Sequence, residues 1–142
     1  FTGNSNPEFA KTICKELGVE LGNSEVKTFA DMCREAKADS KLIFEVGFLT
    51  DEEIATLTKI CCEHGISYVK TATGSQAFPD MNQVQIMKDN LSGDTKIKVS
   101  GVPRTFTLAA AMHMFEKMGV SLIGTRSAGK LVEEYKAYLE TL

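Results

Sequence analysis

The chain lacks any run of apolar residues long enough to cross a membrane, and it does not open on a basic segment followed by an apolar one. Both absences argue against a membrane-bound or secreted protein, so we expect a cytoplasmic one. An excess of one charge is also missing, because 16 Lys and Arg stand against 19 Asp and Glu. We therefore expect neither nucleic acid nor an anionic membrane as partner, although a local basic cluster can bind a small phosphate.

A CxxC spacing is absent as well, although the chain has four cysteines: Cys14, Cys33, Cys61 and Cys62. A disulfide framework and a zinc site are therefore not expected, and buried reduced thiols fit a cytosolic protein better. The two histidines fall in predicted helices beside apolar or acidic neighbours, where surface or helix-end roles are commoner than catalysis. The sequence thus predicts no metal and no cofactor.

Short apolar runs alternate with amphipathic stretches from residue 41 onward. The runs are rich in β-branched or aromatic residues, end at glycine or threonine as strands do, and occupy 41–47, 67–74, 96–101 and 121–125. Helix signals lie between them: Thr50 with Glu53 forms a capping-box pattern, and Asp80 and Thr105 are expected to cap the next two helices. A last helix at about 127–140 is expected to bury Leu131, Val132, Tyr135 and Leu139.

Four strand–helix units at a spacing of roughly 25 residues predict parallel strands joined by crossover helices. A doubly wound sheet and a (β/α)₈ barrel both satisfy the pattern, but a whole barrel normally needs about 250 residues. The predicted fold class is therefore α/β, as a partial (β/α) barrel of about four consecutive units. An N-terminal α/β segment precedes it, with one helix from Pro7 to Gly18 and another from Ser24, where "VKTF" also suits a strand.

Two lysines stand inside predicted strands. Lys70 lies in "SYVKTATG" and Lys98 in "KIKVSG", each near the carboxyl end, and adjacent parallel strands would place both on one face. Burial and a second ammonium group both lower a lysine pKa, and the resulting neutral amine attacks a carbonyl to form a Schiff base. Lys70 and Lys98 are therefore candidate catalytic residues, although a lysine at a strand end more often extends to solvent.

Glycine-rich loops follow the last two predicted strands, as "SGVPRT" and "GTRSAGK". Gly101, Gly124 and Gly129 allow the backbone to approach a ligand, and Ser127 begins a helix whose amide groups and dipole favour a phosphate. Glycine at such a turn is also ordinary turn chemistry. The GxxxxGK spacing at 124–130 is not a P-loop, because Leu131 stands where Ser or Thr would bind magnesium.

Four blocks in this order resemble the C-terminal half of deoxyribose-phosphate aldolase over about residues 36–134: "IFEVGFLTDEEI", "YVKTATG", "IKVSGVPRT" and "IGTRSAGKLV". That family consists of (β/α)₈ barrels, class I metal-free aldolases that cleave 2-deoxyribose 5-phosphate to glyceraldehyde 3-phosphate and acetaldehyde. The resemblance implies Lys70 as the Schiff-base lysine and Lys98 as the lysine that perturbs it and assists proton transfer. The candidate residues for binding the substrate phosphate are Gly74, Gly101, Gly124, Thr125, Arg126 and Ser127.

The chain also departs from that family's pattern. Val102 and Pro103 follow Gly101 where the family usually has a second glycine, and Pro103 has no N–H for a phosphate. Arg126 replaces a small residue, and the family's first four strands, with a proton-relay aspartate, have no counterpart. Half a barrel leaves unpaired strand edges, so we expect self-association that completes the barrel.

Residues 1–31 instead resemble the start of phosphoribosyl pyrophosphate synthetase, on "GNSNP" and "VKTFAD", and that resemblance stops after Asp31. The predicted domains are therefore an N-terminal segment, 1–35, and an aldolase-like half-barrel, 36–142. A natural fusion, an engineered chimera and a mispredicted reading frame all account for such a join. The predicted activity is that of the aldolase. The alternatives are a non-catalytic α/β domain that binds sugar phosphate and an inactive fusion fragment.

Overall fold

The computed structural model describes residues 23–75, 78–103 and 106–142 of the chain. Its four strands form one sheet in the order β1-β2-β3-β4, and every neighbouring pair is parallel. The strands are β1 (Lys41–Ile43), β2 (Tyr68–Lys70), β3 (Lys96–Ser100) and β4 (Val120–Gly124). A helix follows each strand before the next one begins, so the predicted fold class, a partial (β/α) barrel of four consecutive units, is confirmed.

The helices begin close to the predicted residues. They are α2 (Asn23–Glu35), the short 3₁₀ helix η2 (Val46–Phe48), α3 (Asp51–Glu63), α4 (Met81–Asp89), α5 (Leu108–Glu116) and α6 (Ala128–Leu139). Thr50 and Glu53 form the predicted capping box on α3, and Asp80 caps α4. The cap of α5 is Thr107, whose hydroxyl accepts from the Ala110 N–H, rather than the predicted Thr105, which lies outside the described residues. The predicted helix 7–18 also lies outside them.

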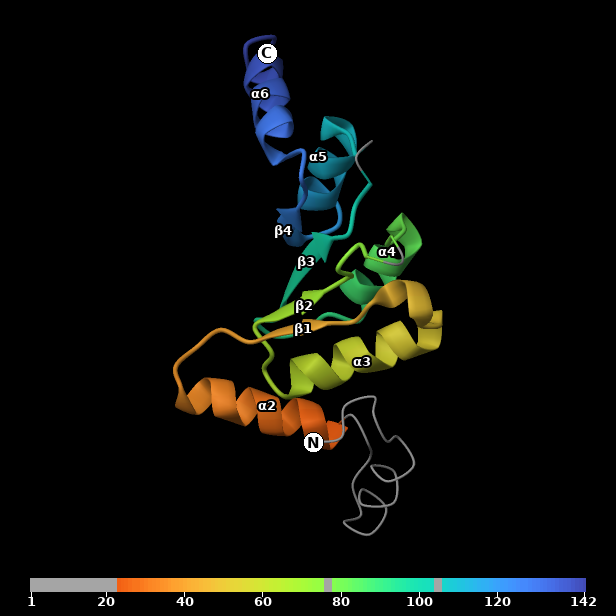
Figure 1. Ribbon diagram of the computed structural model, residues 1–142, viewed down its shortest axis with the longest axis vertical. Helices are drawn as coiled ribbons and strands as arrows, with labels where there is room; N and C mark the ends of the chain where they lie inside the picture. The colour runs from red at the N-terminus through yellow and green to blue at the C-terminus, as the bar shows by residue number, and fades with distance from the viewer. Residues whose placement is uncertain (1–22, 76–77, 104–105) are drawn as a thin grey trace.

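One face of the sheet packs against helices and forms the core. Val69, Ile97 and Val99 point to this side and have no exposed surface, in one cluster with residues of α3 and α4. Helix α2 belongs to the same cluster through Val26 and Ala30. Figure 1 shows α2 and α3 side by side at one end of the molecule and α6 at the other.

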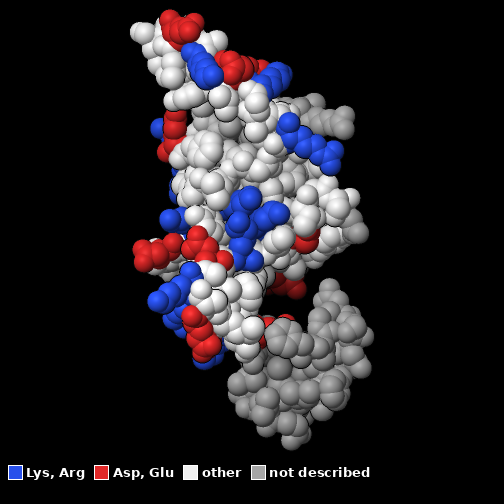
Figure 2. Space-filling model, turned by 60° about the vertical axis from the view of Figure 1, so that its left-hand side comes forward, with Lys and Arg blue, Asp and Glu red and all other residues white. Residues whose placement is uncertain are grey.

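On the opposite face of the sheet, most of the described strand side chains are exposed or half-buried. Strand register places Lys41, Tyr68 and Lys96 in one row across it, and Ile43, Lys70, Lys98 and Leu122 in the next. Lys41 and Lys96 both lie over the Tyr68 ring, at 5.3 and 5.8 Å from its centroid. We call this surface the open face. Figure 2 shows Lys and Arg side chains gathered near the middle of one face of the molecule.

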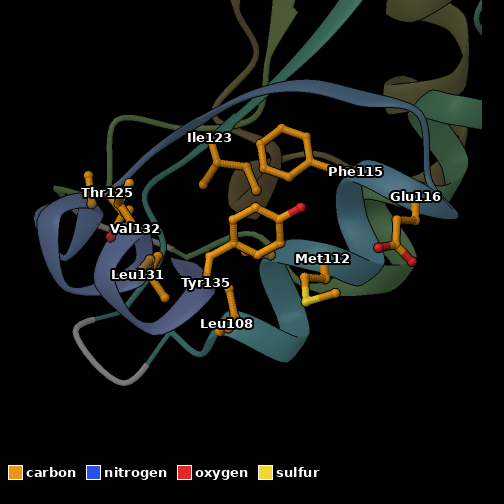
Figure 3. A pocket seen from close by; sticks show the side chains of 11 residues that line it. Leu108, Met112, Phe115, Glu116, Ile123, Thr125, Leu131, Val132 and Tyr135 are labelled. Atoms are coloured by element: carbon orange, nitrogen blue, oxygen red, sulfur yellow. The ribbon is translucent and has the colours of Figure 1, made fainter. Parts of the chain in front are cut away.

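Helix α6 is less buried than its apolar stripe predicts. Leu131 is buried, but Val132, Tyr135 and Leu139 are 44–52% exposed, so this prediction is wrong for those three. Instead of closing onto α5, the stripe borders an apolar cavity of about 490 Å³ between the two helices. Figure 3 shows Tyr135 and Phe115 projecting into it from opposite sides.

Within the described ranges, no helix has the length and apolar character that a membrane crossing requires.

Candidate functional site

The loops at the carboxyl ends of β2, β3 and β4 enclose a cavity of about 480 Å³. In a parallel sheet this is the end where ligands bind, because the loops after the strands meet there. All eight residues selected from the sequence line it. The full set is Lys70, Thr73, Gly74, Phe78, Lys98, Ser100, Gly101, Val102, Pro103, Gly124, Thr125, Arg126 and Ser127.

Lys70 and Lys98 are direct neighbours across β2 and β3, with their Cα atoms in register. Both side chains therefore leave the open face toward the same cavity, and both residues are half-buried. Burial lowers the pKa of Lys98, and the positive charges of Lys41 and Lys70 lower it further. The second of the two candidate lysines therefore has a lowered pKa.

The lowered pKa of Lys98 makes stability depend on pH. Folding with a charged Lys98 costs free energy, because the folded chain disfavours the charged amine. This cost is fully present below the pKa of Lys98 in the folded chain, and it disappears as pH rises past the pKa of Lys98 in the unfolded chain. Lys98→Met removes the charge at every pH. We expect the melting temperature of the variant, minus that of the unmodified chain, to decrease as pH rises toward the ordinary lysine pKa of about 10.4. A difference that stays constant in thermal scans over this rise in pH would contradict the lowered pKa.

The loops after β2 and β3 touch through their glycines. A Cβ atom added to Gly74 would lie 2.7 Å from the Gly101 Cα, and one added to Gly101 would lie 2.9 Å from the Gly74 nitrogen. Both glycines have positive φ, +80° and +78°, which side chains disfavour. The close backbone contact and the positive φ therefore each require glycine at positions 74 and 101.

Buried hydrogen bonds hold these two loops together. The Thr71 hydroxyl donates to the Ser100 carbonyl at 2.9 Å and accepts from the Ser100 N–H at 3.0 Å. The Ser100 hydroxyl donates to the Ala72 carbonyl at 2.6 Å. Thr71 and Ser100 were not selected from the sequence. In the sequence, each is only a hydroxyl residue near the end of a buried strand. That position alone does not show whether the hydroxyl holds two loops together or binds a ligand.

The loop after β4 forms the third wall of the cavity. A Cβ added to Gly124 would lie 3.5 Å from the Lys98 Cε, so Gly124 leaves room for the lysine stem. The Thr125 hydroxyl accepts from the Ser127 N–H at 3.1 Å, and Ser127 is the residue before α6. The first-turn amides of a helix have no partner within the helix and favour an anion. Arg126 adds a positive charge on the same rim.

Glu45 is a residue near this site that the sequence reasoning missed. It follows β1 and has φ 53° and ψ 56°, the left-handed conformation, which costs a residue with a side chain about 1–2 kcal/mol. One carboxylate oxygen accepts from the Thr73 N–H at 2.9 Å. The other is buried and has no hydrogen-bond partner among the described residues. No sequence signal identifies a glutamate that adopts this conformation.

The structure contains no group of three or more His, Cys, Asp or Glu side chains, among the residues it describes, that is arranged to hold a metal ion. Cys33, Cys61 and Cys62 are free thiols. Burial, followed by the neighbouring Cys62, raises the pKa of Cys61 to about 12, so this thiol stays protonated near neutral pH. Cys14 lies outside the described residues.

The four parallel strands and their helices define the class, a (β/α)-barrel type of fold, with a lysine-lined cavity at the carboxyl ends of the strands. Within it, the chain resembles the deoxyribose-phosphate aldolases, as the sequence predicted. It is 34% identical to the deoxyribose-phosphate aldolase of Microcystis aeruginosa over 135 residues, which cover 89% of this chain and 59% of that protein. The chain thus spans little more than half the length of this relative.

Solved structures agree with this resemblance. The structure described as QR15, an aldolase, matches with a TM-score of 0.72 at 27% identity, over 94% of this chain and 58% of that one. The deoxyribose phosphate aldolase of Aeropyrum pernix, described as a unique tetramer, matches with a TM-score of 0.68 over 82% of this chain and 49% of that one. At 23% identity, this second match supports the fold alone.

Residues 1–49 match the N-terminal domain of ribose phosphate pyrophosphokinase, so the predicted second resemblance is also found. The match extends past residue 35 and includes α2, β1 and η2. The division into 1–35 and 36–142 stays a prediction.

Proposed function

We propose that this chain carries the Schiff-base site of a class I aldolase acting on 2-deoxyribose 5-phosphate. The observation that carries the proposal is the convergence of two in-register lysines and three glycine-containing loops on one cavity. The resemblance to deoxyribose-phosphate aldolases supplies the reaction. Roles for Lys70, Lys98 and the phosphate loops follow from this proposal.

In the proposed reaction, the Lys70 amine adds to the C1 aldehyde of the open-chain sugar and water leaves, which forms an iminium ion. Loss of the C3 hydroxyl proton then breaks the C2–C3 bond, whose electrons pass to the iminium and form an enamine. Glyceraldehyde 3-phosphate leaves. Protonation of the enamine carbon and addition of water release acetaldehyde and restore the amine. Lys98 suits the proton transfers, because its lowered pKa favours a neutral, proton-accepting amine.

The phosphate is assigned to the glycine-containing loops that line the cavity. Gly74, Gly101 and Gly124 permit close approach of backbone, and Thr125, Arg126 and Ser127 bring a hydroxyl, a cation and the start of α6. Pro103 also lines the cavity and contributes no N–H. We therefore assign phosphate binding to the loops after β2 and β4 more than to the loop after β3.

Self-association belongs to the proposal because the lysines need shielding from water. Ile43 and Leu122 are 44% and 40% exposed on the open face, in the same row as Lys70 and Lys98. Covering this row would remove apolar surface from water and lower the dielectric around the amines. The tetrameric relative shows that self-association occurs in a protein of this fold.

Borohydride trapping tests the function directly. The chain is treated with dilute acetaldehyde and borohydride, and the modified lysine is located by peptide mass spectrometry, with sedimentation velocity on the same sample. We expect rapid modification concentrated at Lys70 in a self-associated species. Phosphate binding without selective trapping would instead support the non-catalytic sugar-phosphate-binding domain. A chain that neither binds phosphate nor traps acetaldehyde would be identified as an inactive fragment.

A further inference from the structure

We propose that Glu45 is a positioning residue of the sugar-phosphate site, whose carboxylate holds the loop after β2 in its binding shape. This inference rests on the proposed function, because it assigns Glu45 a part in that site. Thr73 and Gly74 line the cavity, whereas Glu45 does not, so Glu45 acts through Thr73.

The backbone on each side of Glu45 is attached to the end of β2. The Phe44 N–H donates to the Lys70 carbonyl at 2.9 Å, and the Val46 N–H donates to the Thr71 carbonyl at 3.0 Å. Between these two bonds the chain adopts the left-handed conformation at Glu45. Glycine or asparagine would enter this conformation more easily, so the presence of glutamate calls for a reason that lies in its side chain.

The contacts of the carboxylate supply that reason. One oxygen accepts from the Thr73 N–H at 2.9 Å, and the other is buried without a hydrogen-bond partner in the described part of the chain. Burial of a half-satisfied carboxylate is unfavourable, so the bond to Thr73 has to offset it. The hydrogen bond to Thr73 therefore accounts for both the strained backbone and the buried carboxylate of Glu45.

The loop transmits this restraint to the rest of the cavity. The Thr73 hydroxyl lies 2.9 Å from the Ser75 hydroxyl, which restrains the loop on its other side. Gly74 lies between these residues and packs directly on the Gly101 backbone. A shift at Thr73 therefore displaces both glycine backbones that border the proposed phosphate site.

Three variants separate the carboxylate from the backbone. Glu45→Ala removes the acceptor and keeps the strain, Glu45→Gly removes both, and Glu45→Gln keeps an oxygen that accepts from Thr73. Glu63→Ala, at an exposed residue of α3, is the matched control. The readouts are Thr73 amide hydrogen exchange by NMR and the affinity for inorganic phosphate by calorimetry.

We expect Glu45→Ala and Glu45→Gly to speed Thr73 exchange and to weaken phosphate binding, each by about tenfold or more. This magnitude corresponds to the loss of one charge-assisted hydrogen bond. Glu45→Gln and Glu63→Ala should stay within about threefold of the unmodified chain. Unchanged exchange in Glu45→Ala, or a Gln variant as impaired as the Ala variant, would overturn the proposal. If the unmodified chain binds no phosphate, the proposed function fails, and Thr73 exchange still decides whether Glu45 holds the loop.

Discussion

Lys70→Met is expected to reduce borohydride trapping with acetaldehyde at least about 100-fold, to the slow rate shared by exposed lysines, because the nucleophile is gone. Methionine preserves the length and apolar character of the stem, so the half-buried position on β2 stays filled. The measurement is the rate of adduct formation, by intact-mass spectrometry at dilute acetaldehyde.

The open face provides the control for this experiment. Lys96 lies on the same face one row away from Lys98 and is exposed, so Lys96→Met should leave the trapping rate unchanged. Lys98→Met should still form the adduct, but more slowly and with an altered pH profile, because a neighbouring charge and a proton acceptor are both lost. A Lys70→Met chain that traps acetaldehyde as fast as the unmodified one would remove Lys70 from the chemistry.

Gly74→Ala is expected to destabilise the fold by roughly 2–5 kcal/mol, from the left-handed backbone and the overpacking together. The new methyl would meet the Gly101 backbone at 2.7 Å, and backbone in a loop tied down by Thr71 and Ser100 has little room to move. Thermal unfolding should show a melting temperature lower by roughly 7–17 °C. Phosphate binding should be lost in the fraction that still folds.

Gly93 offers a matched comparison, because it also has a positive φ, +62°, but the structure places no atom within 4 Å of an added Cβ. Gly93→Ala therefore carries the backbone strain without the clash, and should cost about 1–2 kcal/mol. Equal effects of the two substitutions would mean that the contact between the two glycine loops is unimportant.

Local signals in the sequence predicted most of the elements, and they selected residues that line one cavity in the structure. Thr50 and Glu53 satisfy each other within one helical turn, so their pattern identified the start of α3 without tertiary information. Alternation along two parallel strands likewise predicted that Lys70 and Lys98 share a face, and the register makes them direct neighbours. Both inferences depend on residues close in sequence or on a fixed period of two.

The predictions that failed depended on distant packing. The stripe on α6 identifies an apolar side, but periodicity does not say what covers it, and Tyr135 and Leu139 are half exposed. Two threonines stand before α5, and the choice of Thr107 as its cap depends on where the preceding loop ends. Glu45 depends on two strand-end hydrogen bonds to residues more than 20 positions away, which no local pattern records.

Helix α2 lies in the stretch that matches the pyrophosphokinase domain, and it contributes to the core of the fold. Val26 and Ala30 of α2 pack in one cluster with Ile66 and Val69, which lie outside that stretch. The Arg34 guanidinium also donates to the His64 carbonyl at 3.2 Å, at the end of α3. Helix α2 therefore shares one hydrophobic core with the strands and helices that follow it, and removing α2 would expose apolar residues of that core to water.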